Sequence, residues 1–370
     1  MDLIIRGVVT TTSLCHQTSP EGKGTIMTTL FHSKASDKNE GPITLPYISA
    51  NSVRGLLRRE AAEIVLDEVI RHGVKMDRNL YLSLVRGSFA RTGLASGGAS
   101  YKELAGASAH TFAGLFGGGA YMYRSPMRLE RDLLPVTEAT KHLMPTCVHE
   151  HAIPAGRLLS DALIAPKDDF ARLPETARAV IDDLEAVYAE HMATKATEAA
   201  ATLAAKDSGG ERVSNNNLDN FATAECIVPG VPLYFGISAR GITEPQAGLL
   251  LSAVLRWCNR NALGGGSARG RGSFLPKLSL WMSGAEGGAA SLVTDNLIVG
   301  DSPMAELAQA ECIQRAVQAM QARLVDDAKV GALEAVYPIK IEESAKKAAK
   351  KAKAAKSKTA DAPTAAAAEA

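Results

Sequence analysis

Twelve residues late in the chain combine backbone freedom with positive charge. The run LGGGSARGRGSF, residues 263–274, holds five glycines and two arginines, Arg269 and Arg271. Glycine lets the backbone approach a ligand closely, and the guanidinium group of arginine binds phosphate oxygens. The chemistry that these residue types could support is therefore anion binding, to a nucleotide cofactor or to the phosphates of a long nucleic acid.

The spacing argues against a nucleotide cofactor. A phosphate loop of the ATPase type needs Gly-Lys-Ser/Thr after its glycines, and none follows here. The dinucleotide pattern G-x-G-x-x-G also fails, because Arg269 stands where the third glycine is required. Both motifs open a helix, whereas the next segment, SFLPKLSLWM, is typical of a strand. We therefore predict no cofactor and expect Gly265, Gly266, Arg269 and Arg271 to lie along a phosphodiester chain; a mobile linker is the alternative.

A second phosphate site is predicted where the clearest helix of the sequence begins. Residues 51–69 carry apolar side chains at the spacing of one helix face, and Asn51 or Ser52 is expected to cap them. The unpaired N–H groups of a helix N-terminus attract phosphate. Further donors would come from Ser49, Asn51, Ser52, Arg54 and, one turn later, Arg58. Ordinary capping by Ser52 and a solvated position for Arg58 are the alternatives.

The composition is that of an ordinary globular protein. The chain has 370 residues, of which 46% are hydrophobic, enough for one large or two small domains. We find no apolar run of the length that spans a bilayer, and the alternating N-terminus with its early acid predicts a strand and not a signal peptide. Five widely spaced cysteines without a C-x-x-C pair favour a reducing cytoplasm. We expect a cytoplasmic protein without a membrane partner.

The positive charge is concentrated locally. The net charge is only +1, yet the segment after residue 339 carries +4, which leaves −3 for residues 1–339. Residues 50–131 hold twelve Lys or Arg against seven Asp or Glu, while residues 167–207 hold five against nine. A nucleic-acid-binding protein with an acidic body must cluster its cations in this way. The Lys/Ala-rich residues 341–370 have low complexity and are predicted to be disordered.

The order of the expected elements indicates an α+β fold. Strand, helix, strand, strand, helix, strand is the βαββαβ order of a ferredoxin-like or RNA-recognition-type fold. We predict three parts: a palm of that fold formed by residues 1–135 and 223–340, a long thumb or helical insertion at 136–222, and the tail 341–370. Residues 32–42, HSKASDKNEGP, are rich in turn formers and are expected to form a loop.

Four motifs in this order resemble those of the repeat-associated (RAMP) superfamily of CRISPR proteins. They are LPYISANSVRGLLRRE, FAGLFGGGAYMYRSPMRLERDLL, NNNLDNFATAECIVPGVPLYFGI and LGGGSARGRGSF, and they cover roughly half the chain. Within the superfamily the order is similar to that of the Cas-seven-type backbone subunit. The helical insertion and the basic tail are most like the type IV subunit.

The resemblance implies a crRNA-binding function. Copies of the protein would stack head to tail along the guide spacer in a helical ribonucleoprotein filament with other effector-complex subunits. Each palm would hold a few nucleotides, and each thumb would kink the guide. The guide would then be presented to a target nucleic acid, which we expect to be DNA. The lysine tail could add contacts to phosphates, or it could only improve solubility.

An enzyme is the main alternative. In type III relatives, a loop in this region carries an aspartate that cuts target RNA with a metal, and Asp37 has a comparable place, with Glu40 nearby. Turn loops also recruit aspartate for backbone reasons. We therefore predict no catalytic residue, and keep as the alternative a RAMP-type endoribonuclease that uses Asp37 on target RNA or His149 on precursor RNA. A second alternative is an RNA-recognition module acting alone as a monomer.

The segment CVHEH could hold a metal only if more ligands joined it. Cys147, His149 and His151 would share one face of an extended segment, but no fourth ligand is spaced nearby. We therefore predict no metal, and interpret the segment as a polar strand of the thumb or a place where bases stack.

Overall fold

A computed structural model describes most of the predicted palm and part of the predicted insertion. The described residues are 1–17, 27–28, 31–37, 41–76, 80–81, 83–84, 100–118, 123–154, 156, 158–164, 189, 193, 222–284, 288–329 and 333. Most of the helical insertion predicted within 136–222 and the whole tail 341–370 lie outside these residues.

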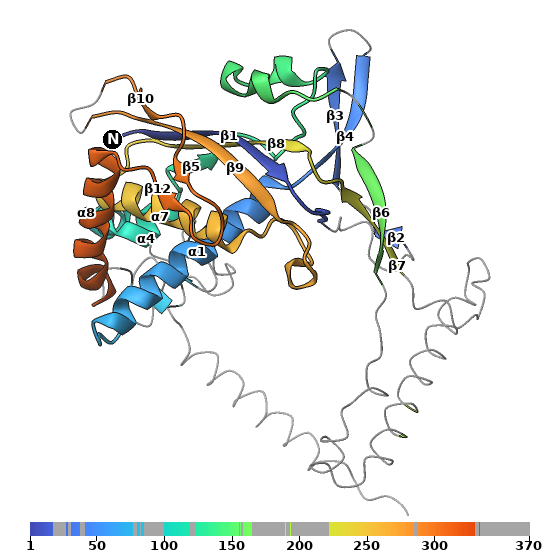
Figure 1. Ribbon diagram of the computed structural model, residues 1–370. Coiled ribbons are helices and arrows are strands. Elements are labelled where there is room, and N and C mark those ends of the chain that lie inside the picture. The colour runs from blue at the N-terminus through green and yellow to red at the C-terminus, as the bar shows by residue number, and fades with distance from the viewer. Residues whose placement is uncertain are drawn as a thin grey trace, which may run out of the picture.

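The centre of the molecule is an antiparallel sheet (Figure 1). Its strands run in the order β10-β9-β1-β8-β5. Their bounds are Leu3–Thr11 for β1, Met127–Leu129 for β5, Pro232–Ala239 for β8, Phe274–Met282 for β9 and Ser291–Thr294 for β10. Without the added edge strand β10, the chain order across the sheet is 4-1-3-2, as expected of a split βαβ arrangement. The predicted α+β palm is confirmed.

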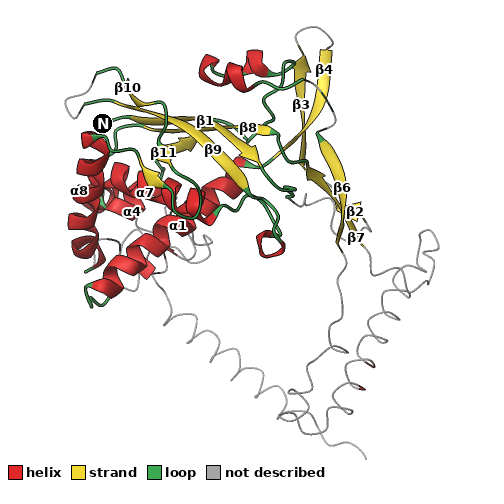
Figure 2. Ribbon diagram, viewed as in Figure 1, coloured by secondary structure: helices red, strands yellow, loops and turns green. Residues whose placement is uncertain are grey.

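Two helices make the crossovers of this fold. Helix α1 (Ala50–Arg71) leads from β1 toward β5, and α7 (Glu244–Arg260) connects β8 to β9. They cover one face of the sheet together with α4 (Thr111–Phe116) and α8 (Glu311–Ala328), as Figure 2 shows, and α3 (Tyr101–Ala109) leads into α4. Among the described helices, none combines the length and the hydropathy that a membrane span requires.

The predicted apolar stripes form the core between sheet and helices. The buried stripe of α1 consists of Val53, Leu57, Ala61, Val65 and Val69. In the middle of the core, Trp257 of α7 lies against Phe235 of β8 and Phe274 of β9, with ring centroids 5.2 Å and 4.7 Å apart. Burying each such side chain stabilises the fold by about 1.5–3 kcal/mol.

Part of the opposite face of the sheet is covered by residues that we assigned to the start of the thumb. Val136, Met144 and Val148 are buried against Val8 of β1 and Tyr234 of β8. Residues 146–151 form a 3-10 helix (Thr146–His151) and not the extended strand that we expected for CVHEH. The proline before it, Pro145, begins this helix, and the side chain of Val148 fixes it on the sheet. The predicted insertion therefore starts with residues that pack on the palm.

Two smaller β units lie beside the palm (Figure 1). One is a three-stranded sheet of β2 (Met27–Thr28), β7 (Ala222–Ile227) and β6 (Leu159–Ile164). The other is a hairpin of β3 (Phe31–Asp37) and β4 (Gly41–Tyr47). The loop predicted at residues 32–42 was wrong for residues 32–37 and 41–42, because backbone pairing continues from Phe31–Tyr47 to Asp37–Gly41. Residues 38–40 of that prediction lie outside the described residues. The short strands β11 (Ile298–Val299) and β12 (Glu306–Leu307) pair with each other.

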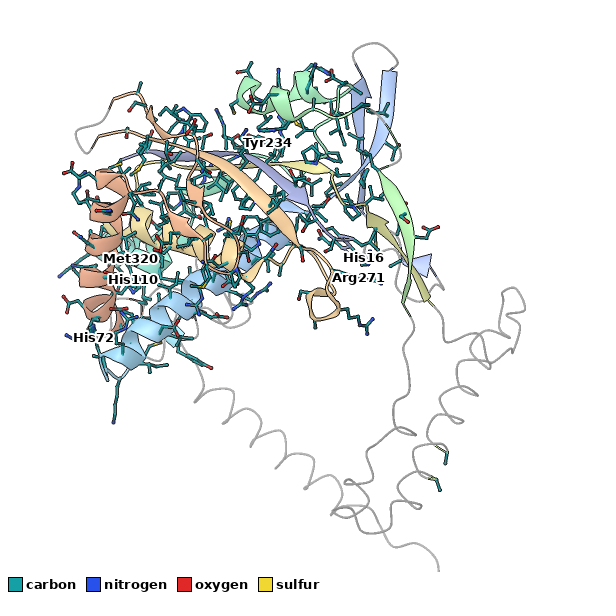
Figure 3. All side chains as sticks on the ribbon, viewed as in Figure 1. His16, His72, His110, Tyr234, Arg271 and Met320 are labelled. Carbon is teal, nitrogen blue, oxygen red and sulfur yellow. The ribbon has the colours of Figure 1, made fainter. Side chains whose placement is uncertain are left out.

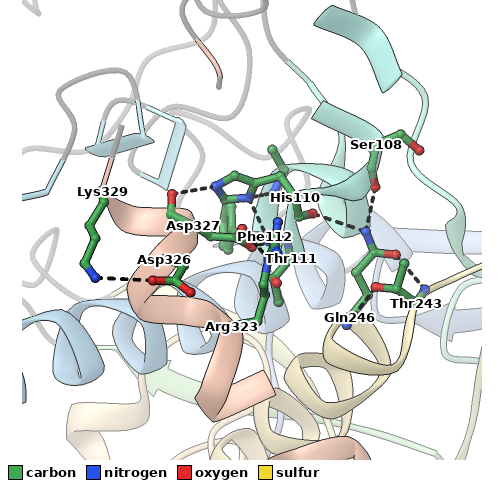
Figure 4. A network of polar contacts seen from close by, with 11 residues as sticks. Ser108, His110, Thr111, Phe112, Thr243, Gln246, Arg323, Asp326, Asp327 and Lys329 are labelled. Atoms are coloured by element: carbon green, nitrogen blue, oxygen red, sulfur yellow. Dashed lines mark hydrogen bonds and ion pairs between the residues drawn. The ribbon is translucent and has the colours of Figure 1, made fainter. Parts of the chain in front are cut away.

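A buried polar network ties the ends of three helices together (Figure 4). The ring Nδ1 of His110 accepts hydrogen bonds from the N–H groups of Phe112 and Ala113 at the start of α4, at 3.1 and 3.2 Å. Its Nε2 lies 3.2 Å from the carbonyl oxygen of Asp327 in α8. Gln246 of α7 donates to the carbonyl of Ser108 at 2.7 Å. These contacts fix α4, whose C-terminal end forms part of the candidate site.

Candidate nucleic-acid interface

The glycine-rich run forms a tight loop between α7 and β9. Residues Ser267–Arg269 make a single 3-10 turn at its tip, and Arg269 is exposed there. The two ends of the loop need glycine for space. A Cβ on Gly264 would lie 2.3 Å from the carbonyl oxygen of His16, and one on Gly272 would lie 2.0 Å from that of Leu263. A side chain at either position would force the backbone apart.

The loop is anchored to the segment that follows β1. Gly265 donates its N–H to the carbonyl of His16 at 2.7 Å, and Gly272 donates to that of Leu14 at 2.9 Å. Below the loop, the thiol of Cys15 donates to the carbonyl of Leu263 at 3.4 Å, and burial raises the pKa of this thiol to about 12. Figure 3 shows His16 beside the loop that carries Arg271. A mobile linker, the alternative considered from sequence, does not fit these contacts.

The same segment also contacts the start of α1. Gln17, the residue after His16, accepts a hydrogen bond from the N–H of Ser49 at 2.8 Å. Its amide nitrogen donates to the hydroxyl of Ser52 at 2.7 Å. The two phosphate sites predicted from sequence, more than 200 residues apart along the chain, therefore lie on either side of residues 12–17.

The start of α1 differs from the prediction. The helix begins after Ser49, which makes no side-chain cap, so that Asn51 and Ser52 lie inside the first turn. The expected capping by either residue is wrong. The cap comes instead from Asp132, whose Oδ1 accepts the N–H of Ala50 at 2.7 Å. A phosphate at this helix end would meet a carboxylate, which weakens the attraction of the helix dipole.

Arg54 and Arg58 lie along the wall of a cavity of about 1060 Å³. Arg54 donates to the carbonyl of Phe116 at 2.6 Å, and burial lowers the pKa of its guanidinium group. Arg58 donates to the carbonyl of Ser83 and lies over the ring of Phe112, 5.6 Å from the centroid. The solvated position considered for Arg58 is wrong, because these contacts hold its side chain against α4.

Two arginines that sequence reasoning missed line the same cavity. Arg124 and Arg128 come from the segment YRSPMR, which the superfamily resemblance included but to which we gave no role. Both side chains are exposed. Their spacing of four residues around a Ser-Pro pair, directly after a glycine run, was the available signal. They line the cavity together with Asn51 and Arg54 from α1.

The residues of the enzymatic and metal hypotheses are elsewhere. Asp37 ends β3, opposite Gly41 in backbone register, and its side chain lies outside the described residues. On the 3-10 helix, His149 Nε2 contacts the carbonyl of Met144 at 2.9 Å and His151 contacts Glu150 at 3.3 Å. Within the described ranges, no three Cys, His, Asp or Glu side chains are grouped as metal ligands would be. Among the described residues, the histidine next to the residues that we predicted to bind phosphate is His16, which lies beside the glycine loop.

No family model matches the sequence, and no curated protein matches it. A solved structure described as "Type IV-B CRISPR Complex" is similar to this chain at 14% sequence identity and a TM-score of 0.45. The match covers 78% of this chain and 93% of the chain in that structure.

Proposed function

We propose that the protein is a crRNA-binding backbone subunit of a type IV CRISPR effector complex. In this proposal, copies assemble along the guide spacer, contact other subunits of the complex, and present the guide to a target DNA strand. The proposal rests on one observation: residues 12–17 form hydrogen bonds both to the glycine loop and to the start of α1. The four superfamily motifs supply the specific identity.

The geometry supports binding of a strand and not of a single nucleotide. Arg269 and Arg271 of the loop and the polar side chains at the start of α1, two segments that residues 12–17 join, can contact consecutive phosphates of one chain. None of these groups is arranged to distinguish one base from another. A guide-holding subunit requires this property, because the guide sequence changes while the protein stays the same.

The fixed loop supports a role in positioning the strand. At Gly264 and Gly272, backbone carbonyl oxygens occupy the space that a side chain would need. A loop that only links two elements does not require such close backbone contacts. Because the loop is rigid, Arg269 at its tip would hold a phosphate at a constant distance from α1. Repeated in each copy, this spacing would set the number of nucleotides per subunit. Such a repeated contact between different surfaces of successive copies produces a head-to-tail array.

The test is the mass of the particle as a function of spacer length. The protein is co-expressed with guide RNAs whose spacers differ by single nucleotides, and the mass of each purified particle is measured. We expect steps of one subunit for every few added nucleotides. The double variant Arg269→Ala/Arg271→Ala should lose subunits from the particle. The control Arg59→Ala/Lys75→Ala removes two charges from exposed positions on and after α1, outside the loop and the cavity, and should keep the steps.

Two results would overturn the proposal. A particle of constant mass on all spacers would favour a monomeric RNA-recognition module, and protein that purifies without RNA would exclude a guide-coating function. The proposal also holds that the subunit cuts no RNA. Cleavage that a chelator stops and that Asp37→Ala abolishes would instead establish the target-ribonuclease alternative. Cleavage that survives the chelator but is lost in His149→Ala would establish processing of precursor RNA.

A further inference from the structure

Arginines also line a second cavity beside the first. This cavity, of about 480 Å³, lies between the ends of α3 and β8, the body of α4 and the start of α7. Tyr123, Arg124, Ser125 and Arg128 line both cavities, so that the strip 123–128 separates them. We name the two cavities together the arginine groove. Its arginines are Arg54, Arg58, Arg124, Arg128 and Arg240.

The described residues that line the groove carry positive charge and no negative charge. No described residue that lines either cavity is an aspartate or a glutamate. Among the described side chains, no carboxylate forms an ion pair with Arg54, Arg124, Arg128 or Arg240. Arg124, Arg128 and Arg240 are exposed, so their guanidinium groups are accessible to a ligand.

Elsewhere in the same protein, arginines that connect elements have acidic partners. Arg256 of α7 contacts Glu63 at 3.0 Å and Asp67 at 2.6 Å, both in α1. Arg260 contacts Glu60 at 3.1 Å. Partly buried charges are normally paired in this way, because an unpaired charge loses hydration without compensation. In the groove, the partly buried Arg54 donates to a carbonyl oxygen, and Arg124, Arg128 and Arg240 are exposed. None of these four has an acidic partner among the described side chains, and an anionic ligand would supply one.

The backbone that carries the groove arginines is held in place. Gly118 and Tyr123 exchange backbone hydrogen bonds of 2.8 and 2.7 Å, which fixes the backbone directly before Arg124. The hydroxyl of Ser125 donates to the carbonyl of Leu115 at 2.6 Å. Arg128 lies on β5 in register with Ser238 of β8. Charges on a fixed backbone lose less entropy on binding than charges on a mobile loop.

From these observations we propose that the arginine groove binds the sugar-phosphate backbone of a single-stranded nucleic acid, at a site separate from the glycine loop. The inference extends the proposed function, since both sites would serve one ribonucleoprotein. Contacts from guanidinium groups to phosphates do not depend on base sequence. Five arginines around cavities of this size match a stretch of several phosphates better than a single anion.

Salt dependence of binding tests the groove directly. The full chain is titrated against fluorescent 20-nucleotide oligouridine and oligothymidine, and the slope of log K against log salt concentration is measured for each. This slope is negative, and for single strands each lost phosphate contact lowers its magnitude by about 0.7. We therefore expect Arg124→Gln/Arg128→Gln to lower it by about 1.4. The control Lys75→Gln/Lys102→Gln removes two exposed charges outside the groove and should leave the slope as in the wild type.

Two further variants separate charge from fold. Arg124→Lys/Arg128→Lys keeps both charges and should keep the slope. Arg269→Gln/Arg271→Gln should lower the slope independently, so that the quadruple variant shows the sum of the two losses. Equal losses with RNA and DNA would assign the contacts to phosphate; a loss with oligouridine alone would assign them to the ribose 2′-hydroxyl and contradict a pure backbone site.

The outcomes distinguish this inference from the proposed function. An unchanged slope for Arg124→Gln/Arg128→Gln, with a lowered slope for the glycine-loop variant, overturns the groove and leaves the function standing. Losses that are less than additive mean that the two sites are one, which also overturns the inference. Wild-type protein that binds neither oligonucleotide overturns both.

Discussion

Two glycines of the glycine-rich loop have similar backbone conformations but different surroundings. Gly270 has φ +73° and open space where a Cβ would lie, whereas Gly272 has φ +79° and the Leu263 carbonyl oxygen only 2.0 Å from where its Cβ would lie. Gly270→Ala should cost only the backbone strain, about 1 kcal/mol of unfolding free energy. Gly272→Ala adds a steric clash and should cost at least about 3 kcal/mol. Urea unfolding measures both values. Equal losses would mean that the loop is not anchored as described.

His110 should make stability depend on pH. Burial lowers its pKa below the ordinary 6.5, and the nearby Arg323 acts in the same direction, while Asp327 opposes both. As pH falls below about 6.5, the unfolded chain therefore binds a proton that the folded chain resists. The contribution of His110 to stability is present above that pH and is lost as the pH falls through the depressed folded pKa, at up to about 1.4 kcal/mol per pH unit.

The variant His110→Asn isolates this effect. Asparagine can accept the same N–H groups at the start of α4 but does not titrate. Unfolding free energies measured between pH 7.5 and pH 5 should fall less steeply for the variant than for the wild type. Parallel curves would assign the acid sensitivity to other groups.

At the scale of elements, the sequence predicted the helices and strands whose apolar pattern depends only on their own residues. The apolar stripe of α1 and the alternation of β1 follow from burial of one face, and both are where they were expected. The cap of α1 was not predictable, because Asp132 is 82 residues away. Strand β3 was missed because its polar residues resemble a turn, while the backbone pairing with β4 decides its conformation. The link through Gln17 likewise depends on the tertiary fold.

Asp132, which caps α1 from a distant part of the chain, gives opposite predictions for protein stability and for RNA binding. Asp132→Asn keeps an oxygen for the Ala50 N–H but removes the charge, and should lower the unfolding free energy by less than about 1 kcal/mol. If a guide phosphate lies at this helix end, removal of the carboxylate should tighten RNA binding several-fold. Both quantities are measured on the same protein. Weaker RNA binding in Asp132→Asn would place the phosphate elsewhere.

The two crossover helices are joined by an ionic network that should contribute to stability. Arg256→Ala would leave Glu60, which is fully buried, with Arg260 as its remaining close partner from α7. We expect a loss of about 2 kcal/mol in unfolding free energy, since part of a buried charge becomes uncompensated. The control Arg315→Ala breaks an exposed pair with Glu244 and should cost at most about 1 kcal/mol. Similar losses would show that the network is not stronger than a surface pair.

At the scale of the whole molecule, charge is divided between a body and a tail. Residues 1–339 sum to −3, while the remaining residues carry +4. Positioning of RNA is therefore expected from the clustered cations of the glycine loop and the arginine groove. The tail can only add attraction that acts over about a Debye length, about 8 Å at physiological salt.

Deletion of residues 341–370 should separate these two contributions. We expect weaker binding to oligouridine and a smaller salt slope, because up to seven tail lysines no longer release counterions. The subunit steps with spacer length should persist, because the fixed loop and helix determine them. A full-length chain with the tail lysines replaced by glutamine is the matched control, and it should behave like the deletion if charge alone matters. Loss of the steps in both variants would mean that the tail takes part in assembly, and that the rigid palm alone does not set the spacing.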